Sequence, residues 1–566
     1  CTAASTLLRG FRSYGAVLAG YTVALIAMPA VDRPESIFTL AMARVAVVSL
    51  GIASSALVGA VLTGHGAGRQ LDQMLRAMLA ELFAHCRQAL QAGQALVLKP
   101  QRRALAMRLG SLDSAIQFAA AEDPRHGARF AALRDSAAAF YGALTAAPAV
   151  TEALESAGAE PFVVESRHEA EAAIDEALAA LAARDDAALQ DARRRLGALR
   201  QRLEGVFESG VERLAPTSVV AVDRLADLVA ELERAALGLS DETAEWRVRR
   251  NATHLDWRWA GRNAARAAAA VLLAGSLWFG LGWSIFGATM MASVAPNVAL
   301  LSLRERPSAD AMDMVWGVAA ASVLGLFYLL WVLPQITGFP LLAMWLAPPI
   351  MISAAVMTVP RLMFSGIGFG VFFVTLLGPS NPMVYDPNVF MNNALATIAG
   401  AALTAIAYQL VLPIDIRALS RHLLVEIRRD LGELLQRGKS VSALEWEGRM
   451  HDRMRLLVAR LRAANIRSDS ALRSGFAALR LGRDVSRLRA LVAPDPAADR
   501  LAREALATLG GPRRGAALAG AAEALRVRAA ELEPGQAAPI LRAAAILPSI
   551  DALVAGRRRF FEQALQ

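Results

Sequence analysis

The sequence predicts an all-α protein, in which a polytopic membrane helix bundle is combined with two helical domains outside the membrane. Three observations predict this fold. The 566 residues have a mean hydropathy of +0.37, which is high for a soluble chain. Charged residues still make up 20% of the chain, so apolar and charged segments must alternate. Apolar residues outside the longest apolar stretches recur at three-and-four spacing, and few segments alternate in the manner of strands.

Several stretches are apolar over the length of about 20 residues that a helix needs to cross a membrane. An early pair is followed, after a long gap, by a group of six. The predicted spans lie near residues 13–31, 40–63, 265–282, 285–303, 312–333, 339–359, 362–378 and 389–412. The expected domains are the last two spans of a first membrane bundle (1–68), a helical domain (69–258), a second membrane bundle of six spans (259–412) and a second helical domain (413–566).

The two charged segments are expected to be helical. The stretch "EAEAAIDEALAALAARDDAALQDARRRLGALRQRLE" (169–204) places apolar residues at three-and-four spacing and charges on the opposite face. Breakers at 493–499, 510–515 and 533–539 divide the last segment into several helices. We expect intramolecular helical hairpins, and a homo-oligomer held by heptads is the alternative.

Arginine is concentrated in every second loop between the predicted spans, which indicates the orientation in the membrane. The basic loops include Arg69 after the second span, Arg304 after the fourth and Arg361 after the sixth. The loops on the other side carry no Lys or Arg except Arg33. The basic side, together with both helical domains, is therefore predicted to be cytoplasmic.

The chain contains a weak internal repeat. A shift of 349 residues places Arg12 on Arg361 and Arg44 on Asn393, and each copy runs through two spans into a charged helical segment. This order predicts two copies of a six-span bundle with a helical domain, an arrangement typical of secondary transporters. The start, "CTAASTLL", has neither an initiator Met nor a signal-peptide region. We therefore expect an N-terminally truncated chain, in which the first copy lacks about four spans.

Several classes of function are disfavoured. Two cysteines, Cys1 and Cys86, and seven scattered histidines show no metal-ligand spacing, so no metal site is expected. No GxxxxGK[ST] phosphate loop, nucleophile elbow, paired-carboxylate motif or cofactor loop occurs, so neither a cofactor nor an enzyme activity is expected. Residues 413–566 hold 27 Arg and Lys against 17 acidic residues but no nucleic-acid motif. Their expected neighbour is therefore the anionic lipid bilayer, not nucleic acid.

Four stretches of the later membrane segment resemble the fusaric acid resistance family of bacterial inner-membrane proteins, which includes the aromatic acid exporters. They are "LWFGLGWSIFGATMMA" (277–292), "LRERP" (303–307), "WVLPQITGFPLLAMWLAP" (331–348) and "NPMVYDPNVFMNNALATIAG" (381–400). Near the start, "DRPESIFTLAMARVAVVSLGI" (32–52) is similar to the last loop and span of that family's first half. The most specific strings are NPM.YD...F.NN and VLP...GFPLLA.

The resemblance implies export. Members of the family look like efflux pumps for small aromatic carboxylic acids that are driven by the proton gradient. Some work with a periplasmic adaptor protein and an outer-membrane channel. For this chain, the resemblance implies an inner-membrane efflux transporter for such acids or for related toxic organic anions. Two alternatives stay open: a passive anion channel on the same fold, and a non-transporting membrane scaffold whose helical domains recruit partners.

Arg44 lies inside an apolar span, where an arginine costs about 2.5–3.5 kcal/mol on insertion scales. It lies about four residues in from the outer side, so its long side chain can partly reach the interface. A guanidinium binds a carboxylate through two parallel hydrogen bonds, so Arg44 is a candidate counter-charge for a carboxylate substrate. The alternative is an ion pair or a carbonyl contact that holds the bundle together.

Five further residues are candidates for the transport path. Asn392 and Asn393 are candidates to line it, because an amide at that depth has to form hydrogen bonds. Asp313 and Asp386 are candidates for proton coupling. The alternatives are that Asp386 caps the last span and that Asp313 interacts favourably with the dipole at a helix N-terminus. Trp283 is a candidate to stack on an aromatic substrate, and a place in an interfacial aromatic belt is its alternative.

Overall fold

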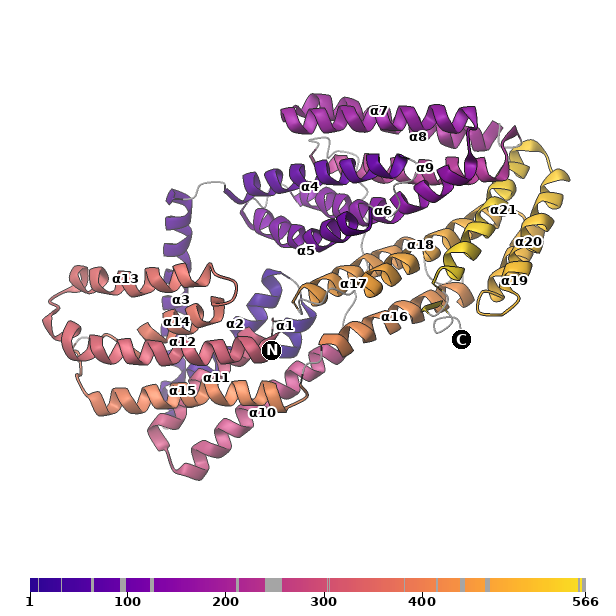
Figure 1. Cartoon of the computed structure of the whole chain (residues 1–566). Helices are drawn as coiled ribbons and strands as arrows, with labels where there is room; N and C mark the ends of the chain where they lie inside the picture. The colour runs from indigo at the N-terminus through magenta and orange to yellow at the C-terminus, as the bar shows by residue number, and fades with distance from the viewer. Residues whose placement is uncertain are drawn as a thin grey trace. The chain divides into compact units, whose positions relative to one another are not determined.

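The computed structural model of the chain is built from helices joined by short connections (Figure 1). It describes residues 1–8, 10–31, 33–62, 66–91, 98–122, 127–209, 213–239, 257–302, 304, 306–380, 382–413, 416–437, 443–463, 469–557 and 560–561. Of the LRERP motif, Leu303 and Glu305 therefore lie outside the described residues. The described residues contain no strand, so the prediction of an all-α fold is confirmed.

The helices form two compact units, and each unit joins two segments that are far apart in the sequence. The membrane unit consists of Cys1–Thr63 and Leu255–Ile416. The helical unit consists of Gly64–His254 and Arg417–Gln566. The apolar segments thus pack with each other, and so do the charged segments. The division of the chain into four sequence domains stays a prediction.

The membrane unit contains the helices of the predicted spans. Its α-helices are α1 (Thr2–Leu7), α2 (Phe11–Ala27), α3 (Ile37–Leu62), α10 (Trp257–Leu281), α11 (Ser284–Leu301), α12 (Pro307–Phe327), α13 (Phe339–Met357), α14 (Met363–Leu377) and α15 (Pro387–Leu410). The segments long and apolar enough to span a membrane include Pro34–Val61, Trp257–Leu281, Pro307–Gln335, Phe339–Met357 and Pro387–Leu410. Phe11–Ala27, Phe286–Leu301 and Met363–Leu377 are apolar but shorter.

Two of these helices begin earlier than predicted. α10 starts at Trp257 instead of near residue 265, and α12 starts at Pro307 instead of near residue 312. Hydropathy detects the part of a helix that lies in lipid, whereas backbone hydrogen bonding continues into the polar turns. α10 therefore includes Arg258 and Arg262 in its first turns.

One further helix, α21 (Pro534–Ala555), is also long and apolar enough to span a membrane, but it belongs to the helical unit. Ile540, Leu547 and Ile550 are buried in the core of that unit, together with residues of α18 (Asp469–Val492) and α20 (Arg514–Ala530). A helix that is apolar all round is buried either in lipid or in a protein core. The packing of α21 fits the second case.

Glycines allow α12 and α14 to pack closely. A Cβ on Gly317 of α12 would lie 2.2 Å from the carbonyl oxygen of Ser365 in α14. A Cβ on Gly368 of α14 would lie 2.8 Å from the carbonyl oxygen of Met314 in α12. Small residues at such crossings let two backbones approach each other within a membrane. This contact therefore fixes the centre of the later bundle.

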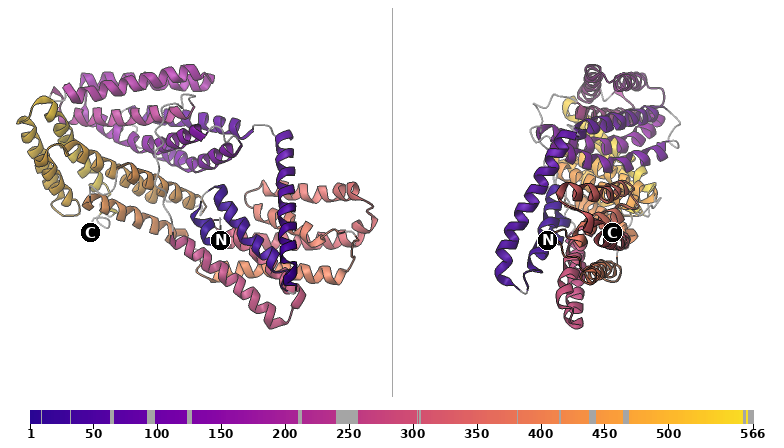
Figure 2. Two further views of the ribbon diagram at one scale, coloured as in Figure 1. Left: turned by 180° about the vertical axis from the view of Figure 1, so that it is seen from behind. Right: turned by 90° about the vertical axis from the view of Figure 1, so that its left-hand side faces the viewer.

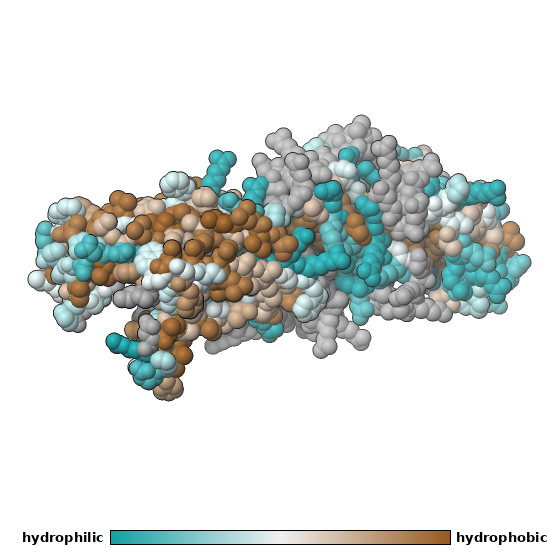
Figure 3. Space-filling model, turned by 90° about the horizontal axis from the view of Figure 1, so that it is seen from below, coloured by the Kyte–Doolittle hydropathy of each residue, from teal (hydrophilic) through white to brown (hydrophobic). Residues whose placement is uncertain are grey.

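Helix α3 runs across the direction of α12 and α15 and packs mainly against α2 (Figures 1 and 2). Its apolar side chains are exposed, including Val45, Leu50 and Val61 at 60%, 68% and 75%. Hydrophobic residues also cover much of the surface over the later membrane helices (Figure 3). Exposed apolar surface on this scale is expected of helices that face lipid or further membrane helices.

The helical unit is built from antiparallel helices. They are α4 (Gly66–Leu90), α5 (Leu98–Glu122), α6 (Gly127–Ala157), α7 (Pro161–Ala183), α8 (Asp186–Ser209), α9 (Pro216–Ala236), α16 (Ile416–Arg437), α17 (Ala443–Ala463), α18, α19 (Pro496–Ala507), α20 and α21. The stretch 169–204 folds as the predicted hairpin of α7 and α8. Arg184 makes the turn in the left-handed region, at φ 57°, and Asp185 accepts a hydrogen bond from the backbone N–H of Ala188 at 3.0 Å.

A buried network of charges joins the two sequence segments of the helical unit. Asp223 of α9 is 1% exposed, and it accepts hydrogen bonds from Arg487 of α18 at 2.8 Å and from Arg542 of α21 at 2.6 Å. Its neighbour Arg224, which is 3% exposed, binds Asp484 of α18 at 2.5 Å. Buried charges need partners of this kind, because an unpaired charge in a protein core is very costly.

The helix bounds agree with the internal repeat. Under the shift of 349 residues, α2, α3 and α4 fall on α14, α15 and α16, with their ends matching to within about three residues. Each copy therefore passes through two apolar helices into an amphipathic helix of the helical unit. Helices of similar length in the same order give stronger support to a repeat than the few matching letters do.

Candidate functional site

Polar side chains line the contact between α11 and α15, at one residue per helical turn. Thr289 donates a hydrogen bond to Oδ1 of Asn393 at 3.0 Å, and Ser293 donates to the carbonyl oxygen of Thr397 at 2.9 Å. Both pairs are 104 residues apart in the chain, so the two helices run parallel. We name Thr289, Ser293, Asn297, Asn393 and Thr397 the α11–α15 polar seam.

Asn297 is the most deeply buried amide of the seam, with 1% of its surface exposed. Its Nδ2 lies 3.5 Å from the hydroxyl of Ser293, and its Oδ1 has no hydrogen-bond partner among the described residues. Leaving a buried acceptor unpaired costs about 1–3 kcal/mol. Polar residues kept inside membrane helices at such a cost are typically functional.

Gly400 brings the two helices of the seam together. A Cβ at this position would lie 2.5 Å from the carbonyl oxygen of Met290 and 2.9 Å from the Cβ of Ser293. Hydrogen bonds between membrane helices contribute on average only about 0.6 kcal/mol each. Close packing at Gly400 therefore contributes to the contact of α11 with α15 beside these weak hydrogen bonds.

Arg266 of α10 is fully buried in the membrane unit, and carbonyl groups at the end of α15 accept its hydrogen bonds. Its Nε donates to the carbonyl oxygen of Val411 at 3.1 Å, and its Nη2 donates to that of Leu412. Its Nη1 donates to Oδ1 of Asn263 at 2.9 Å. A cation that binds the last carbonyls of a helix also interacts favourably with the helix dipole. Arg266 therefore fixes the end of α15 against α10.

The structure places Asn393 in the seam and Asn392 outside it. Nδ2 of Asn392 donates to the carbonyl oxygen of Asn388 in its own helix at 2.9 Å. The seam residues that were not predicted from the sequence are Thr289, Ser293, Asn297 and Thr397. A signal was present, because three of them recur at i, i+4 and i+8 in an otherwise apolar helix and so share one face.

Arg44 faces α2, where its guanidinium interacts with the hydroxyl of Tyr21. Its Nε is buried and has no hydrogen-bond partner among the described residues. No carboxylate pairs with Arg44 in the described part of the chain. The guanidinium therefore retains hydrogen-bonding capacity that an anion could use.

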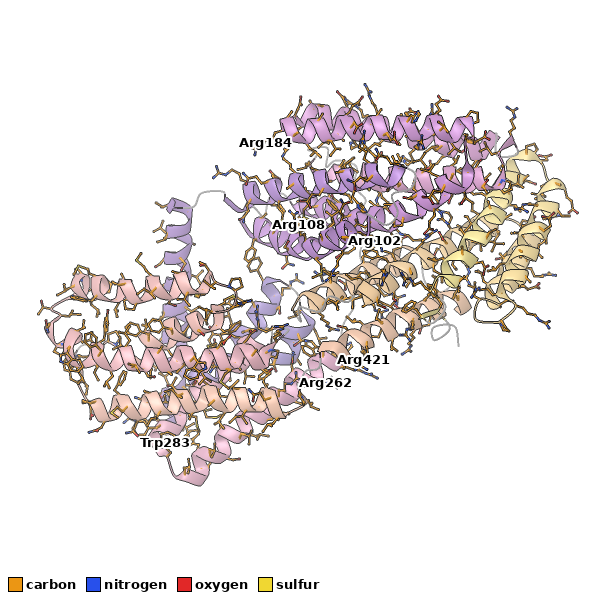
Figure 4. All side chains as sticks on the ribbon, viewed as in Figure 1. Arg102, Arg108, Arg184, Arg262, Trp283 and Arg421 are labelled. Atoms are coloured by element: carbon orange, nitrogen blue, oxygen red, sulfur yellow. The ribbon has the colours of Figure 1, made fainter. Side chains whose placement is uncertain are left out.

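The remaining candidates lie apart from one another. The carboxylate of Asp313 has no hydrogen bond or ion pair with a described residue, and its carbonyl oxygen accepts from Ser365 at 3.0 Å. Trp283 precedes α11 at the turn from α10, and its ring centroid lies 6.2 Å from that of Phe286 (Figure 4). Within the described residues, no hydrogen bond or ion pair joins Arg44, Asn393 and Asp313.

Asp386 is the N-cap of α15. Its Oδ1 accepts hydrogen bonds from the backbone N–H groups of Asn388 at 2.9 Å and of Val389 at 3.1 Å. Pro387 follows at the first helical position, where its missing N–H group leaves no unpaired donor. Capping accounts for this carboxylate, and its role in proton coupling stays a prediction.

Comparison with known sequences decides the family. The sequence model described as the fusaric acid resistance protein family matches residues 1–561. The chain belongs to this family. The resemblance seen in its membrane segments is therefore confirmed, and it extends through the helical unit.

Two curated relatives are similar to this chain at low identity. An uncharacterized transporter of Gluconobacter oxydans, GOX0755, is 25% identical over 438 residues, which cover 72% of this chain and 57% of that protein. The p-hydroxybenzoic acid efflux pump subunit AaeB of Enterobacter cloacae is 21% identical over 420 residues, or 73% of this chain and 61% of that protein. The chain thus spans about three fifths of the length of these relatives. No solved structure matches it.

Asp386 gives a direct test of capping against proton coupling in this family member. Asp386→Ala is expected to destabilise the membrane unit by about 1 kcal/mol, because two backbone N–H groups lose their acceptor. Asp386→Ser keeps a capping oxygen without a titratable group, and it is expected to retain both stability and transport. The measurements are thermal unfolding in detergent and efflux from cells. Loss of transport in the serine variant would contradict the capping role.

Proposed function

We propose that the protein exports small aromatic carboxylic acids, or related organic anions, across the bacterial inner membrane at the expense of the proton gradient. The observation that carries this proposal is the family match over residues 1–561. A relative that covers most of this chain is named a p-hydroxybenzoic acid efflux pump subunit, which identifies an acid to test first. A periplasmic adaptor and an outer-membrane channel are proposed as partners.

The proposed orientation places the arginine-rich helix ends and the helical unit in the cytoplasm. Arg262 lies in the first turns of α10 (Figure 4), Arg304 and Arg306 lie between α11 and α12, and Arg361 lies between α13 and α14. These connections alternate with ones that carry no Lys or Arg. An excess of Arg and Lys in short loops is typical of the cytoplasmic side.

The proposed path uses two features of the membrane unit. Arg44 supplies positive charge with unused hydrogen-bonding capacity, and the α11–α15 polar seam supplies neutral amide and hydroxyl groups along the contact between these two helices. A carboxylate needs a cation for recognition, and a neutral polar lining lets it leave again. Asp313 is the proposed proton-coupling residue, since no described residue pairs with its carboxylate.

The first experiment measures efflux of p-hydroxybenzoate from cells that express the wild type or Arg44→Gln at equal membrane levels. Export is expected to fall about tenfold or more in the variant, because a hydrogen-bonded charge pair contributes about 1.5–3 kcal/mol. Arg33→Gln is the matched control, since Arg33 is an exposed arginine in the preceding connection. Equal export by wild type and Arg44→Gln would make Arg44 a structural residue.

The second experiment tests the seam with Asn297→Leu. The free energy of unfolding is expected to rise by about 1 kcal/mol, because an unpaired buried acceptor is removed, while export falls. Ser322→Ala in α12 is the control, because among the described residues that buried hydroxyl binds only a carbonyl group of its own helix, and it lies outside the seam. Normal export by a stable Asn297→Leu protein would exclude Asn297 from the path.

The two alternative functions make different predictions in the same assay. A proton-driven exporter moves the acid against its gradient, and an uncoupler abolishes this movement. A passive channel moves the acid only down its gradient and is indifferent to the uncoupler. A scaffold produces no flux with any acid, and Arg44→Gln then has no effect.

A further inference from the structure

Two buried polar side chains face each other one turn beyond the hydrogen bonds of the α11–α15 polar seam. A Cβ on Gly400 would lie 2.9 Å from the Cβ of Ser293, so these residues meet across the parallel helices α11 and α15 (Figure 1). Four residues later on each helix come Asn297 and Thr404, which are 1% and 0% exposed. The register therefore places the amide of Asn297 and the hydroxyl of Thr404 at the same level of a buried contact.

The hydroxyl protons at this level are already used. Ser293 donates to the carbonyl oxygen of Thr397 at 2.9 Å, and Thr404 donates to that of Gly400 at 3.0 Å. A hydroxyl oxygen that has donated its proton keeps lone pairs, so both oxygens are left as acceptors. Oδ1 of Asn297 has no hydrogen-bond partner among the described residues. Reversing the amide would not give this oxygen a donor from either hydroxyl, because neither has a proton to spare.

A proline adds a backbone oxygen to this set. Pro296 lies inside α11 and has no N–H group, so the carbonyl oxygen of Ala292 lacks the helical hydrogen bond that it would otherwise accept. Ala292 directly precedes Ser293, one turn before Asn297. We name the carbonyl oxygen of Ala292 and the side-chain oxygens of Ser293, Asn297 and Thr404 the α11–α15 oxygen cluster. All four oxygens are neutral, and α11 and α15 contain no Asp, Glu, Lys or Arg.

The chemistry of the cluster indicates its ligand. Acceptors without donors suit a cation, and a divalent cation is disfavoured because Ca²⁺ and Mg²⁺ sites rely on carboxylates. Carbonyl oxygens at interruptions of membrane helices bind monovalent cations in secondary transporters. We propose that the α11–α15 oxygen cluster binds a dehydrated alkali cation, Na⁺ or K⁺. The described residues hold no group of three or more His, Cys, Asp or Glu, but such a site needs none. The inference goes beyond the proposed function, which concerns an organic acid and protons.

The experiment measures the thermal unfolding midpoint of the purified full-length chain in detergent, in choline chloride that is replaced stepwise by NaCl or KCl at constant ionic strength. The midpoint is expected to rise by about 3–5 °C at a hundred times the dissociation constant of the bound cation, as linkage requires. The cation that acts at the lower concentration identifies the ligand. Equal midpoints in all three chlorides would show that water fills the cluster and would overturn the proposal.

Two variants locate the cation. Asn297→Leu is expected to lose the cation-dependent rise, while its midpoint in choline chloride stays at or above the wild-type value because an unpaired acceptor is removed. Thr404→Val keeps the shape of the side chain and removes one ligand oxygen, so about tenfold more cation is expected to be needed for the same rise. A full rise in Asn297→Leu would place the cation elsewhere and contradict the site.

Ser322→Ala is the matched control for Thr404→Val. The hydroxyl of Ser322 is also buried and also donates to the carbonyl oxygen four residues earlier, but it lies in α12, outside the cluster. This variant is expected to keep the full cation-dependent rise. A loss as large as that of Thr404→Val would count against the site. Because no acid is present in these measurements, their outcome does not depend on whether the protein exports acids, and a failure of export would leave the cation site unaffected.

Discussion

Asp223→Ala is expected to destabilise the helical unit by about 3 kcal/mol, because it removes the buried carboxylate that Arg487 and Arg542 share. Asp223 accepts hydrogen bonds from Arg487 and Arg542, and these three residues join α9, α18 and α21. Their loss therefore weakens the contact between the two sequence segments of the unit. The measurement is chemical unfolding in detergent, followed by circular dichroism of the helical signal.

The same carboxylate is expected to make the unit sensitive to acid. Burial alone would raise the pKa of Asp223, but the charges of Arg487, Arg542 and Arg224 outweigh it and lower the pKa to about 2. A group whose pKa is lower in the folded state stabilises the fold above its unfolded pKa, near 4, and loses that contribution as the pH falls toward 2. The loss is about 2 kcal/mol. Asp223→Asn is expected to remove this part of the pH dependence.

Asp191→Ala is the matched control for Asp223→Ala. Asp191 also pairs with an arginine, Arg194, but both side chains are more than 60% exposed. Exposed pairs contribute about 0–1 kcal/mol, so the control is expected to change stability by less than about 0.5 kcal/mol. Equal effects of the two substitutions would show that the buried network does not hold the unit together.

The membrane fold could largely be predicted from the sequence, because a span needs a long apolar stretch and the loops carry an orientation signal. The early starts of α10 and α12 could not be predicted, because backbone hydrogen bonding continues into polar residues beyond the apolar stretch. The apolar helix α21 was not among the predicted spans, and it lies in the core of the helical unit. The network around Asp223 was beyond prediction, because its partners lie more than 260 residues away and depend on tertiary packing.

The residues of the candidate site could also be predicted only in part. Asn393 stood out in the sequence because an amide is rare in an apolar span, but its partner Thr289 depends on the register between α11 and α15. Arg44 stood out for its charge, whereas its neighbour Tyr21 follows from the packing of α2 on α3. Sequence patterns thus identify residues that are unusual for their element, and packing determines which of them meet.

Gly317→Ala is expected to disrupt the later membrane bundle, at a cost of about 3 kcal/mol. The added Cβ would lie 2.2 Å from the carbonyl oxygen of Ser365 and 2.9 Å from the backbone nitrogen of Phe369, so a whole helix has to move. The measurement is the yield of folded protein and its unfolding midpoint in detergent. Gly275→Ala in α10 is the control, because nothing lies within 4 Å of a Cβ there and alanine favours the helix by up to about 1 kcal/mol. If Gly317→Ala proved as stable as Gly275→Ala, α12 and α14 could not be in backbone contact. Transport should fail in parallel with folding, because α12 also packs against α15, the helix that carries Asn393 of the polar seam.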